Sequence, residues 1–291
     1  MDDILEICKF LDKNNWHAVY LSDHFMHHKN HVKNGNMIEC WTGLSAIASA
    51  TKNIKISSFV SPLSFRHPGI LANMATTVDE ISKGRLILGI GAGWQENEHL
   101  SYGFNLLDPK DRIDRFKEGA ECIIGLLNNP EFSFDGKYYK FDNATCEPKK
   151  YNHDIPIMIG CWSGNPRMLS IGKKYGDIIN LIGSPEFLIK KLNSNIKNDT
   201  DLYKNVAYNI FLLDNFTQPI LKKNLEGKNG LIKPLPVGGI DFISKSKLIN
   251  YINLYKSMNF DEILISDISF INNDDLFLIL NYIKNSIEEI N

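Results

Sequence analysis

The sequence lacks the features that define several large classes of protein. Its five cysteines are odd in number and form no C-x-x-C pair, which argues against a disulfide framework and a structural zinc site. No apolar run approaches the roughly 18 residues that a membrane helix needs, and Met1-Asp2-Asp3 does not resemble the start of a signal peptide. We therefore expect a protein of a reduced, cytoplasmic compartment with no membrane partner.

An excess of positive charge is also missing. The net charge is −2 and the lysines are scattered, which argues against nucleic acid or an anionic membrane as the main partner. What the chain does have is length and apolar content, with 291 residues of which 43% are hydrophobic. This is enough for one large domain, 1–291, whose core needs neither disulfides nor metals.

Strand-like apolar runs alternate with helical patterns along most of the chain. The predicted strands are 17–23, 54–62, 85–91, 155–160, 176–183, 206–214 and 261–267. Such alternation predicts βαβ units and a parallel sheet. Because a closed (β/α)8 TIM-type barrel needs an eighth strand and the chain begins on a helical pattern at residue 2, we expect an α/β barrel without its first strand.

Two segments interrupt this pattern. Residues 131–141 alternate aromatic and polar side chains around Asp135-Gly136, a favoured tight turn, and predict a small β-hairpin insertion. Residues 215–243 carry three prolines and four glycines without a steady period. They form either a lid or insertion, or an ordinary surface loop.

The stretch "SDHFMHHKNH" (22–31) holds four histidines within eight residues. Their spacing of three, one and three, in a predicted loop with no cysteine nearby except Cys40, does not fit a zinc site, and we expect no metal. Asp23 and His24 stand apart because they follow a predicted strand directly, and the carboxyl ends of strands form the active-site face of an α/β barrel. His24 is therefore a candidate acid or base; the alternative is a helix-capping Asp23 beside an exposed histidine.

The strand 85–91 runs into three glycines spaced two apart, Gly89, Gly91 and Gly93. The spacing G-x-G-x-G is a weak dinucleotide signal, and Glu96 and Glu98 would repel a phosphate at the helix that follows. Glycine lets a flat ring approach the backbone closely. We therefore interpret this loop, including Trp94, as a wall of a cofactor cavity.

The loop after strand 155–160 is a better phosphate site. It offers backbone N–H groups, the Ser163 hydroxyl, a helix beginning at Pro166 and the cation Arg167, a combination that suits an anion. The alternative is an ordinary loop between strand and helix.

Four segments together resemble one known family: "NNWHAVYLSDHF", "FVSPLSFRHPGILANMATTVDEISKGRLILGIGAGWQENEHLSYGF", "DRIDRFKEGAECI" and "PIMIGCWSGNPRMLSIGKKYGDIIN". They are similar to the bacterial luciferase-like superfamily, and more closely to its branch of coenzyme F420-dependent oxidoreductases. The resemblance implies a (β/α)8 barrel that binds F420 or FMN at the carboxyl ends of its strands, usually as a homodimer.

The resemblance also assigns roles to residues. It implies that Asp23 and His24 border the cofactor ring, and that a backbone bulge, often with a non-prolyl cis peptide, lies behind the ring at Phe59, Val60 and Ser61. It implies a ring-side wall at Gly91, Gly93 and Trp94. It implies a phosphate loop at Gly160, Cys161, Trp162, Ser163, Gly164 and Asn165. His24 is the foremost candidate for proton transfer, followed by Glu98 and then His99.

The chain departs from the family in three places. The family's first strand is missing, so either the start is truncated or the barrel is open there. Trp94 stands where the family's sugar-phosphate dehydrogenases have a catalytic acid, which argues against a sugar-phosphate substrate. Residues 215–243, which commonly shape the substrate pocket, are divergent.

From these features we expect an oxidoreductase that moves a hydride between F420 and a small organic substrate. The alternatives are an FMN-dependent two-component monooxygenase and a non-catalytic flavin-binding protein.

Overall fold

The computed structural model describes residues 1–26, 37–149, 151, 153–162, 164–192, 194–207, 209–212, 240–264 and 273–288. The chain forms two compact units, each of which is described by itself. Unit 1 comprises Met1–Gly160 and Pro166–Ile178, and unit 2 comprises Cys161–Asn165 and Ile179–Asn291.

The strands of unit 1 form a parallel sheet in the order β1-β2-β4-β7, and a short strand, β3, pairs with β4. Their bounds are β1 Ala18–Leu21, β2 Lys55–Ser58, β3 Ser61–Pro62, β4 Leu86–Gly91 and β7 Ile157–Gly160. Every residue of β4 is buried. A near-continuous apolar run of this kind is typical of a parallel strand that is covered on both faces.

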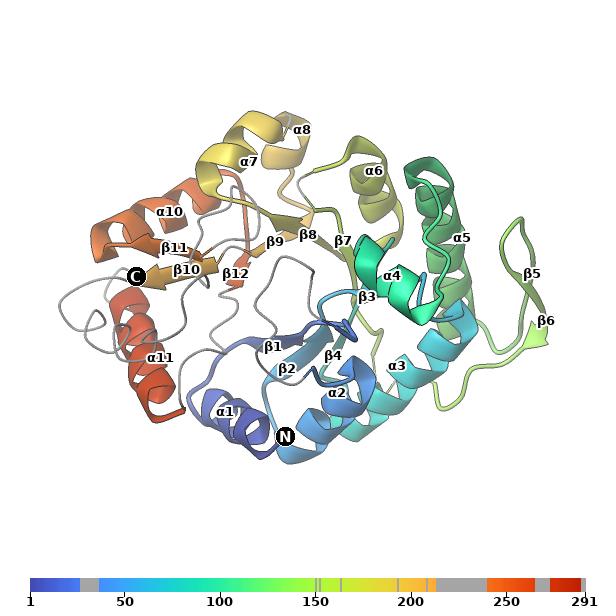
Figure 1. Ribbon diagram of the computed structural model, residues 1–291, viewed down its shortest axis with the longest axis horizontal. Coiled ribbons are helices and arrows are strands. Elements are labelled where there is room, and N and C mark those ends of the chain that lie inside the picture. Colours follow the sequence, from blue (N-terminus) through green and yellow to red (C-terminus); the bar gives the residue numbers. More distant parts are fainter. Residues whose placement is uncertain are drawn as a thin grey trace. The chain divides into compact units, whose positions relative to one another are not determined.

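The described part of unit 1 also contains six helices, of which α2 and α3 pack against the strands of its sheet (Figure 1). Their bounds are α1 Asp2–Lys13, α2 Cys40–Ala50, α3 Pro68–Ser82, α4 Glu96–Tyr102, α5 Pro109–Asn128 and α6 Pro166–Tyr175. Helices α3, α5 and α6 each begin at a proline, whose missing N–H costs nothing in the first turn.

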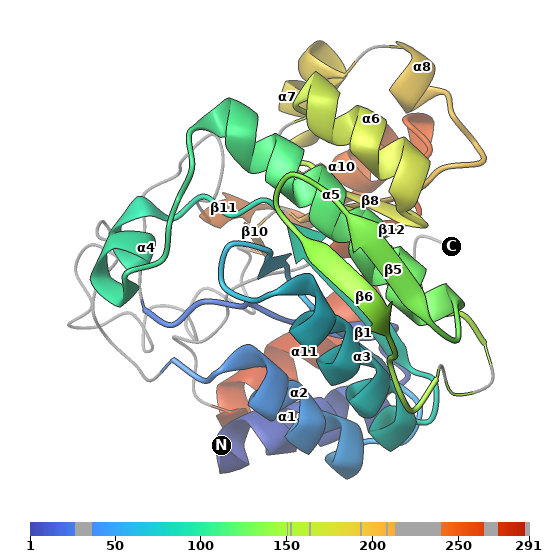
Figure 2. The same ribbon diagram turned by 90° about the vertical axis from the view of Figure 1, so that its right-hand side faces the viewer.

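The predicted insertion is an antiparallel hairpin of β5 (Phe132–Asp135) and β6 (Lys140–Ala144), which lies beside α5 (Figure 2). The prediction of a tight two-residue turn at Asp135-Gly136 was wrong, because residues 136–139 separate the strands. The carboxylate of Glu118 explains the wider loop. It accepts hydrogen bonds from three successive backbone N–H groups, those of Lys137, Tyr138 and Tyr139.

In unit 2, β8, β9 and β12 are neighbours in that order, and β10 pairs with β11 in a parallel two-stranded sheet. The bounds are β8 Ile178–Ile182, β9 Tyr203–Ala207, β10 Asn209–Leu212, β11 Ile240–Ile243 and β12 Glu262–Leu264. The helices are α7 Pro185–Lys191, α8 Ser194–Lys197, α10 Lys245–Ser257 and α11 Asn273–Glu288.

The parallel strands and intervening helices confirm the α/β class. The predicted strand 206–214 was wrong as a single element, because its residues divide between β9 and β10, which belong to different sheets. Of the predicted lid or insertion, 215–243, residues 215–239 lie outside the described residues, and its last residues form β11.

Candidate functional site

Asp23 follows β1 and is held by an ion pair that the sequence analysis did not predict. Its carboxylate is 1% exposed and accepts hydrogen bonds from both terminal nitrogens of Arg66, at 2.6 and 3.1 Å. Arg66 also contacts Glu39 at 2.6 Å, and Glu39 caps α2 by accepting from Trp41 and Thr42. The sequence showed that Asp23 and Arg66 carry opposite charges and that each follows a strand, but the pairing of the two side chains is visible only in the fold.

Ser61 extends this group of side chains. The buried indole of Trp41 donates to the hydroxyl oxygen of Ser61 at 3.0 Å, and Ser61 is hydrogen-bonded to Asp23. Burial raises the pKa of Asp23, while Arg66 and Ser61 oppose that shift. For Arg66, burial disfavours the charge, but the carboxylates of Asp23 and Glu39 outweigh it and raise the pKa. Asp23 therefore positions the end of β1. Its carboxylate is buried against Arg66 and does not face a bound molecule as an acid.

His24 is held by Glu98, the third residue of α4. Its Nδ1 lies 2.7 Å from Oε2 of Glu98, and the Glu98 side chain is fully buried. The other carboxylate oxygen accepts from the backbone N–H groups of Phe25 and Met26. Glu98 therefore fixes three successive residues after β1, and the predicted catalytic pair is brought together.

The environment of Glu98 determines which form it takes. Burial alone would raise its pKa, but the hydrogen bonds from His24, Phe25 and Met26 outweigh burial and lower it. An ionised carboxylate can only accept, so His24 carries its proton on Nδ1. Nε2 of His24, on a side chain 21% exposed, has no hydrogen-bond partner among the described residues, and it can exchange a proton with a bound molecule.

Trp94 lies beside His24. The two rings meet edge to face, with centroids 5.8 Å apart and planes at 84°, and Trp94 is 43% exposed. The indole therefore lies next to the histidine ring, and the assignment of this loop to a cofactor cavity stays a prediction.

Behind this group, the predicted strand 54–62 is interrupted between β2 and β3. The peptide bond between Phe59 and Val60 is cis, at the position that the family resemblance implies. Val60 fills the space that side chains at Gly91 and Gly160 would occupy, since a Cβ there would lie 2.7 and 2.9 Å from its Cγ2. These two glycines therefore accommodate the bulge, a reason that the sequence analysis had not identified.

Gly93 and the buried His99 both lie against the side chain of Ser64. Gly93 has φ +85°, and a Cβ on it would lie 2.5 Å from Oγ of Ser64. His99 is 1% exposed and bonds Gln95 and Ser64 at 2.7 Å each. Burial lowers its pKa. His99 is engaged on both nitrogens and holds the loop, so it is a poorer candidate for proton transfer than His24.

The predicted phosphate loop continues in unit 2. The N–H of Cys161 donates to Asn180 at 2.8 Å, and the N–H of Gly164 donates to Cys161 at 3.0 Å. Two backbone groups that were expected to bind phosphate are thus engaged within the protein. Arg167 of α6 is paired with Asp114 at 2.5 Å. Ser163 lies outside the described residues, and the phosphate assignment stays a prediction.

Three of the four histidines in 22–31 also lie outside the described residues. In the part of the chain that is described, no group of three or more His, Cys, Asp or Glu side chains is placed to hold a metal ion. No helix among the described residues is both long and apolar enough to span a membrane.

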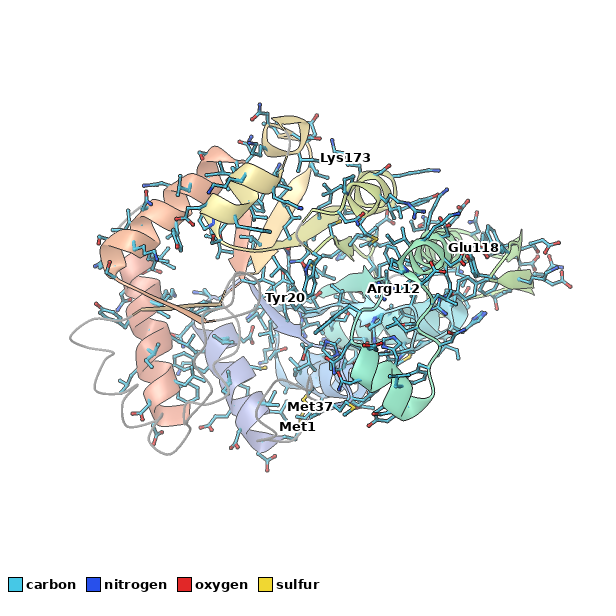
Figure 3. The ribbon with its side chains drawn as sticks, turned by 45° about the horizontal axis from the view of Figure 1, so that its top comes forward. Met1, Tyr20, Met37, Arg112, Glu118 and Lys173 are labelled. Atoms are coloured by element: carbon cyan, nitrogen blue, oxygen red, sulfur yellow. The ribbon has the colours of Figure 1, made fainter. Side chains whose placement is uncertain are left out.

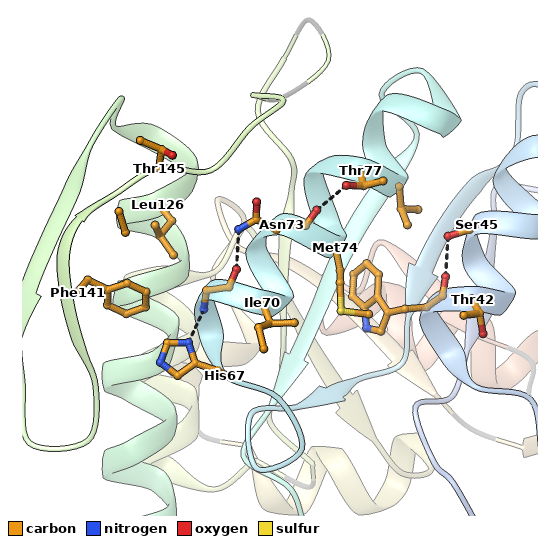
Figure 4. Close-up of a pocket in the computed structure, with 14 residues that line it drawn as sticks. Thr42, Ser45, His67, Ile70, Asn73, Met74, Thr77, Leu126, Phe141 and Thr145 are labelled. Atoms are coloured by element: carbon orange, nitrogen blue, oxygen red, sulfur yellow. Dashed lines mark hydrogen bonds between the residues drawn. The ribbon is translucent and has the colours of Figure 1, made fainter.

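Two cavities occur elsewhere in unit 1, and neither is lined by His24. The first, of about 610 Å³, lies among α2, α3, α5 and β6; we call it the α2–α3 groove (Figure 4). The second, of about 440 Å³, is lined by the loop between β3 and α3, the loop before α5, α5 itself and the hairpin. We call it the Arg115 pocket.

The family model of the luciferase-like monooxygenases matches residues 1–198. The chain therefore belongs to this family. A relative from Microbacterium testaceum (strain StLB037), an F420-dependent glucose-6-phosphate dehydrogenase, is 29% identical over 196 residues, which are 66% of this chain and 56% of that protein. The chain spans about half the length of the curated relatives it matches.

Solved structures with low sequence identity share the fold. An F420-dependent secondary alcohol dehydrogenase in complex with an F420-acetone adduct aligns with a TM-score of 0.74 and 17% identity, covering 96% of this chain and 93% of that one. The oxygenating constituent of 3,6-diketocamphane monooxygenase from Pseudomonas putida, in complex with FMN, aligns with a TM-score of 0.67 and 16% identity, covering 97% and 91%. The fold class predicted from the sequence is thereby confirmed.

Proposed function

We propose that this protein is an F420-dependent oxidoreductase that transfers a hydride between the cofactor and a small organic substrate. The observation that carries the proposal is the His24–Glu98 pair at the end of β1. Glu98 fixes the ring of His24 and leaves Nε2 to face a bound molecule, which is the arrangement of a positioned acid or base. Relatives and fold neighbours that use F420 support the choice of cofactor.

The residues around His24 fit a flat cofactor ring. Trp94 supplies an exposed aromatic face, and Val60, inserted against two glycines, supplies an apolar surface of fixed shape. When bound, the deazaflavin supplies the hydride chemistry. The tasks of the chain are to orient the reactants, exclude water and move a proton at Nε2 of His24. We further propose that Gly160–Asn165 holds the phosphate of the cofactor.

Turnover and cofactor binding test this function separately. We expect His24→Ala to lower turnover at least a hundredfold while the Kd for F420 changes by less than threefold, because Trp94 and Val60 remain. The exposed residue His17 gives the matched control, His17→Ala.

Activity should be assayed on secondary alcohols, ketones, imines, activated C=C bonds and glucose 6-phosphate. We expect no turnover of glucose 6-phosphate, because Trp94 stands where the sugar-phosphate dehydrogenases have a catalytic acid. Unchanged turnover in His24→Ala would refute the proton-transfer role.

The second candidate is an FMN-dependent two-component monooxygenase, which the FMN-bound fold neighbour favours. Titrating the protein with F420 and with FMN, and recording the spectrum of the cofactor retained after gel filtration, distinguishes the two. Retention of FMN but not F420 would overturn the first choice. Retention of either cofactor without turnover on any substrate would favour a non-catalytic flavin-binding protein.

We also propose a homodimer that buries the α2–α3 groove. Ile70, which lines it, is 58% exposed. The polar lining residues Ser45, Asn73 and Thr77 each donate to a carbonyl of their own helix at 2.8 Å, so the groove offers an apolar surface (Figure 4). Exposed apolar patches of this kind mark contact surfaces.

The five cysteines are buried and unbridged, which supports the proposal of a reduced, cytoplasmic compartment.

A further inference from the structure

The Arg115 pocket has an unbalanced positive charge. Its lining includes Arg66, His67 and Arg115, and none of the lining residues, all within the described part of the chain, carries a carboxylate. The charge of Arg66 is already balanced by Asp23 and Glu39. Arg115 is different, because among the described residues both terminal nitrogens of its guanidinium donate only to the carbonyl of Asn105, each at a long 3.3 Å.

The acids near Arg115 are engaged elsewhere. On or just before α5 they are Asp108, Asp111, Asp114 and Glu118. Asp108 caps the helix, and Asp111 accepts from the side chains of Lys137 and Tyr138. Asp114 pairs with Arg167, and Glu118 accepts from backbone N–H groups of the hairpin. Among the described residues, therefore, no carboxylate forms an ion pair with Arg115.

A second cation adds to this charge. Arg112 lies one turn before Arg115 on α5 (Figure 3 labels Arg112 and Glu118 on this helix). Burial and the neighbouring charge of Arg115 lower the pKa of Arg112. Two like charges this close repel each other in the ligand-free protein, and a bound anion would relieve that repulsion.

The rest of the lining suits an organic molecule. His67 accepts from the N–H of Gly69 through Nδ1, so its proton is on Nε2 and can be donated. Leu63, Leu107 and the buried ring of Tyr139 contribute apolar surface. A planar guanidinium binds a carboxylate or a phosphate through two parallel hydrogen bonds.

We propose that the Arg115 pocket binds a small organic oxyanion, a carboxylate or a phosphate ester with an apolar body, through the guanidinium of Arg115. The pocket belongs to unit 1 alone, and the proposal does not rest on the proposed oxidoreductase function. It places an anionic ligand against the loop that follows Ser61 and carries Arg66, and these are the two side chains that hold Asp23.

The test is calorimetric titration of cofactor-free protein with benzoate, phenyl phosphate and the neutral analogue benzyl alcohol. We expect at least one anion to bind, with an affinity that falls as salt is added, and benzyl alcohol to bind at least tenfold more weakly. The anion that binds more tightly identifies the class of ligand. Failure of both anions to bind, or equal binding of benzyl alcohol, would overturn the proposal.

Variants locate the site. Arg115→Gln should weaken anion binding about tenfold or more. The affinity of Arg115→Lys should lie between those of the wild type and Arg115→Gln, because lysine keeps the charge but not the planar group. Lys117→Gln removes the same charge from an exposed position on the same helix and should change nothing. Equal affinities in the wild type and Arg115→Gln would refute the site. A protein that binds anions through Arg115 but transfers no hydride would refute the proposed function and leave this pocket standing.

Discussion

Glu98 is the residue on which the geometry of the candidate site depends most. One oxygen accepts from two backbone N–H groups and the other from His24. Glutamine has a single acceptor oxygen, so Glu98→Gln leaves either the backbone groups or His24 without an acceptor. We expect the free energy of unfolding to fall by about 1–3 kcal/mol and turnover to fall with it. Urea denaturation measures the first, and exposed Glu96→Gln on the same helix is the control.

Because Glu98 is ionised in the folded protein, we also expect the stability of the protein to depend on pH. The pKa of Glu98 is lowered in the folded protein from its ordinary value of 4.5, so its stabilisation is fully present above that pH. It is lost as the pH falls through the folded-state pKa. The stability difference between the wild type and Glu98→Gln should therefore narrow on acidification below pH 4.5, the ordinary pKa of a glutamate. A stability difference between the two proteins that stays constant from neutral pH to pH 3 would contradict the conclusion that Glu98 is ionised in the folded protein.

Sequence patterns predicted individual residues only where local position was enough. Asp23 and His24 were predicted because they follow a strand, whereas Glu98 was named only as a weaker candidate for proton transfer. The pairing of Arg66 with Asp23 and Glu39 joins residues 43 and 27 positions apart. Such a pairing depends on which strands become neighbours, and it could not be predicted from the sequence alone.

At the scale of elements, the hairpin depends on one carboxylate of α5. Glu118 accepts from the backbone of Lys137, Tyr138 and Tyr139, at 3.1, 2.7 and 2.7 Å. We expect Glu118→Ala to speed hydrogen exchange at these three amides by about tenfold or more, since each bond contributes about 1 kcal/mol. Exchange measured by mass spectrometry checks this, with exposed Lys117→Ala as the control. Unaltered protection would show that the strands alone hold the loop.

Elements were predicted well where apolar runs were long and bounded by glycine, as for β4. Elements were predicted poorly where one continuous apolar run covers two strands. The apolar run 206–214 contains no glycine or proline that would mark its division into β9 and β10. The run 54–62 likewise gives no sign of the bulge between β2 and β3, which only the family resemblance implied.

At the scale of the whole molecule, the α2–α3 groove leads to a prediction about assembly. If a second copy covers this groove, Ile70→Glu places a charge in an apolar contact and should convert the dimer to a monomer. Ile81, on the same helix and 41% exposed, does not line the groove, and Ile81→Glu should leave the mass unchanged. Light scattering after gel filtration measures both. A monomeric wild type would exclude the dimer.

The ion pairs of Arg66 have a consequence for how this site can evolve. One guanidinium joins the end of β1, the start of α2 and the segment before α3. Neither Asp23 nor Arg66 can lose its charge alone, because the change would leave a buried partner unbalanced. Variation in substrate preference should therefore concentrate away from the end of β1 and the segment before α3, and these two segments should change only in concert.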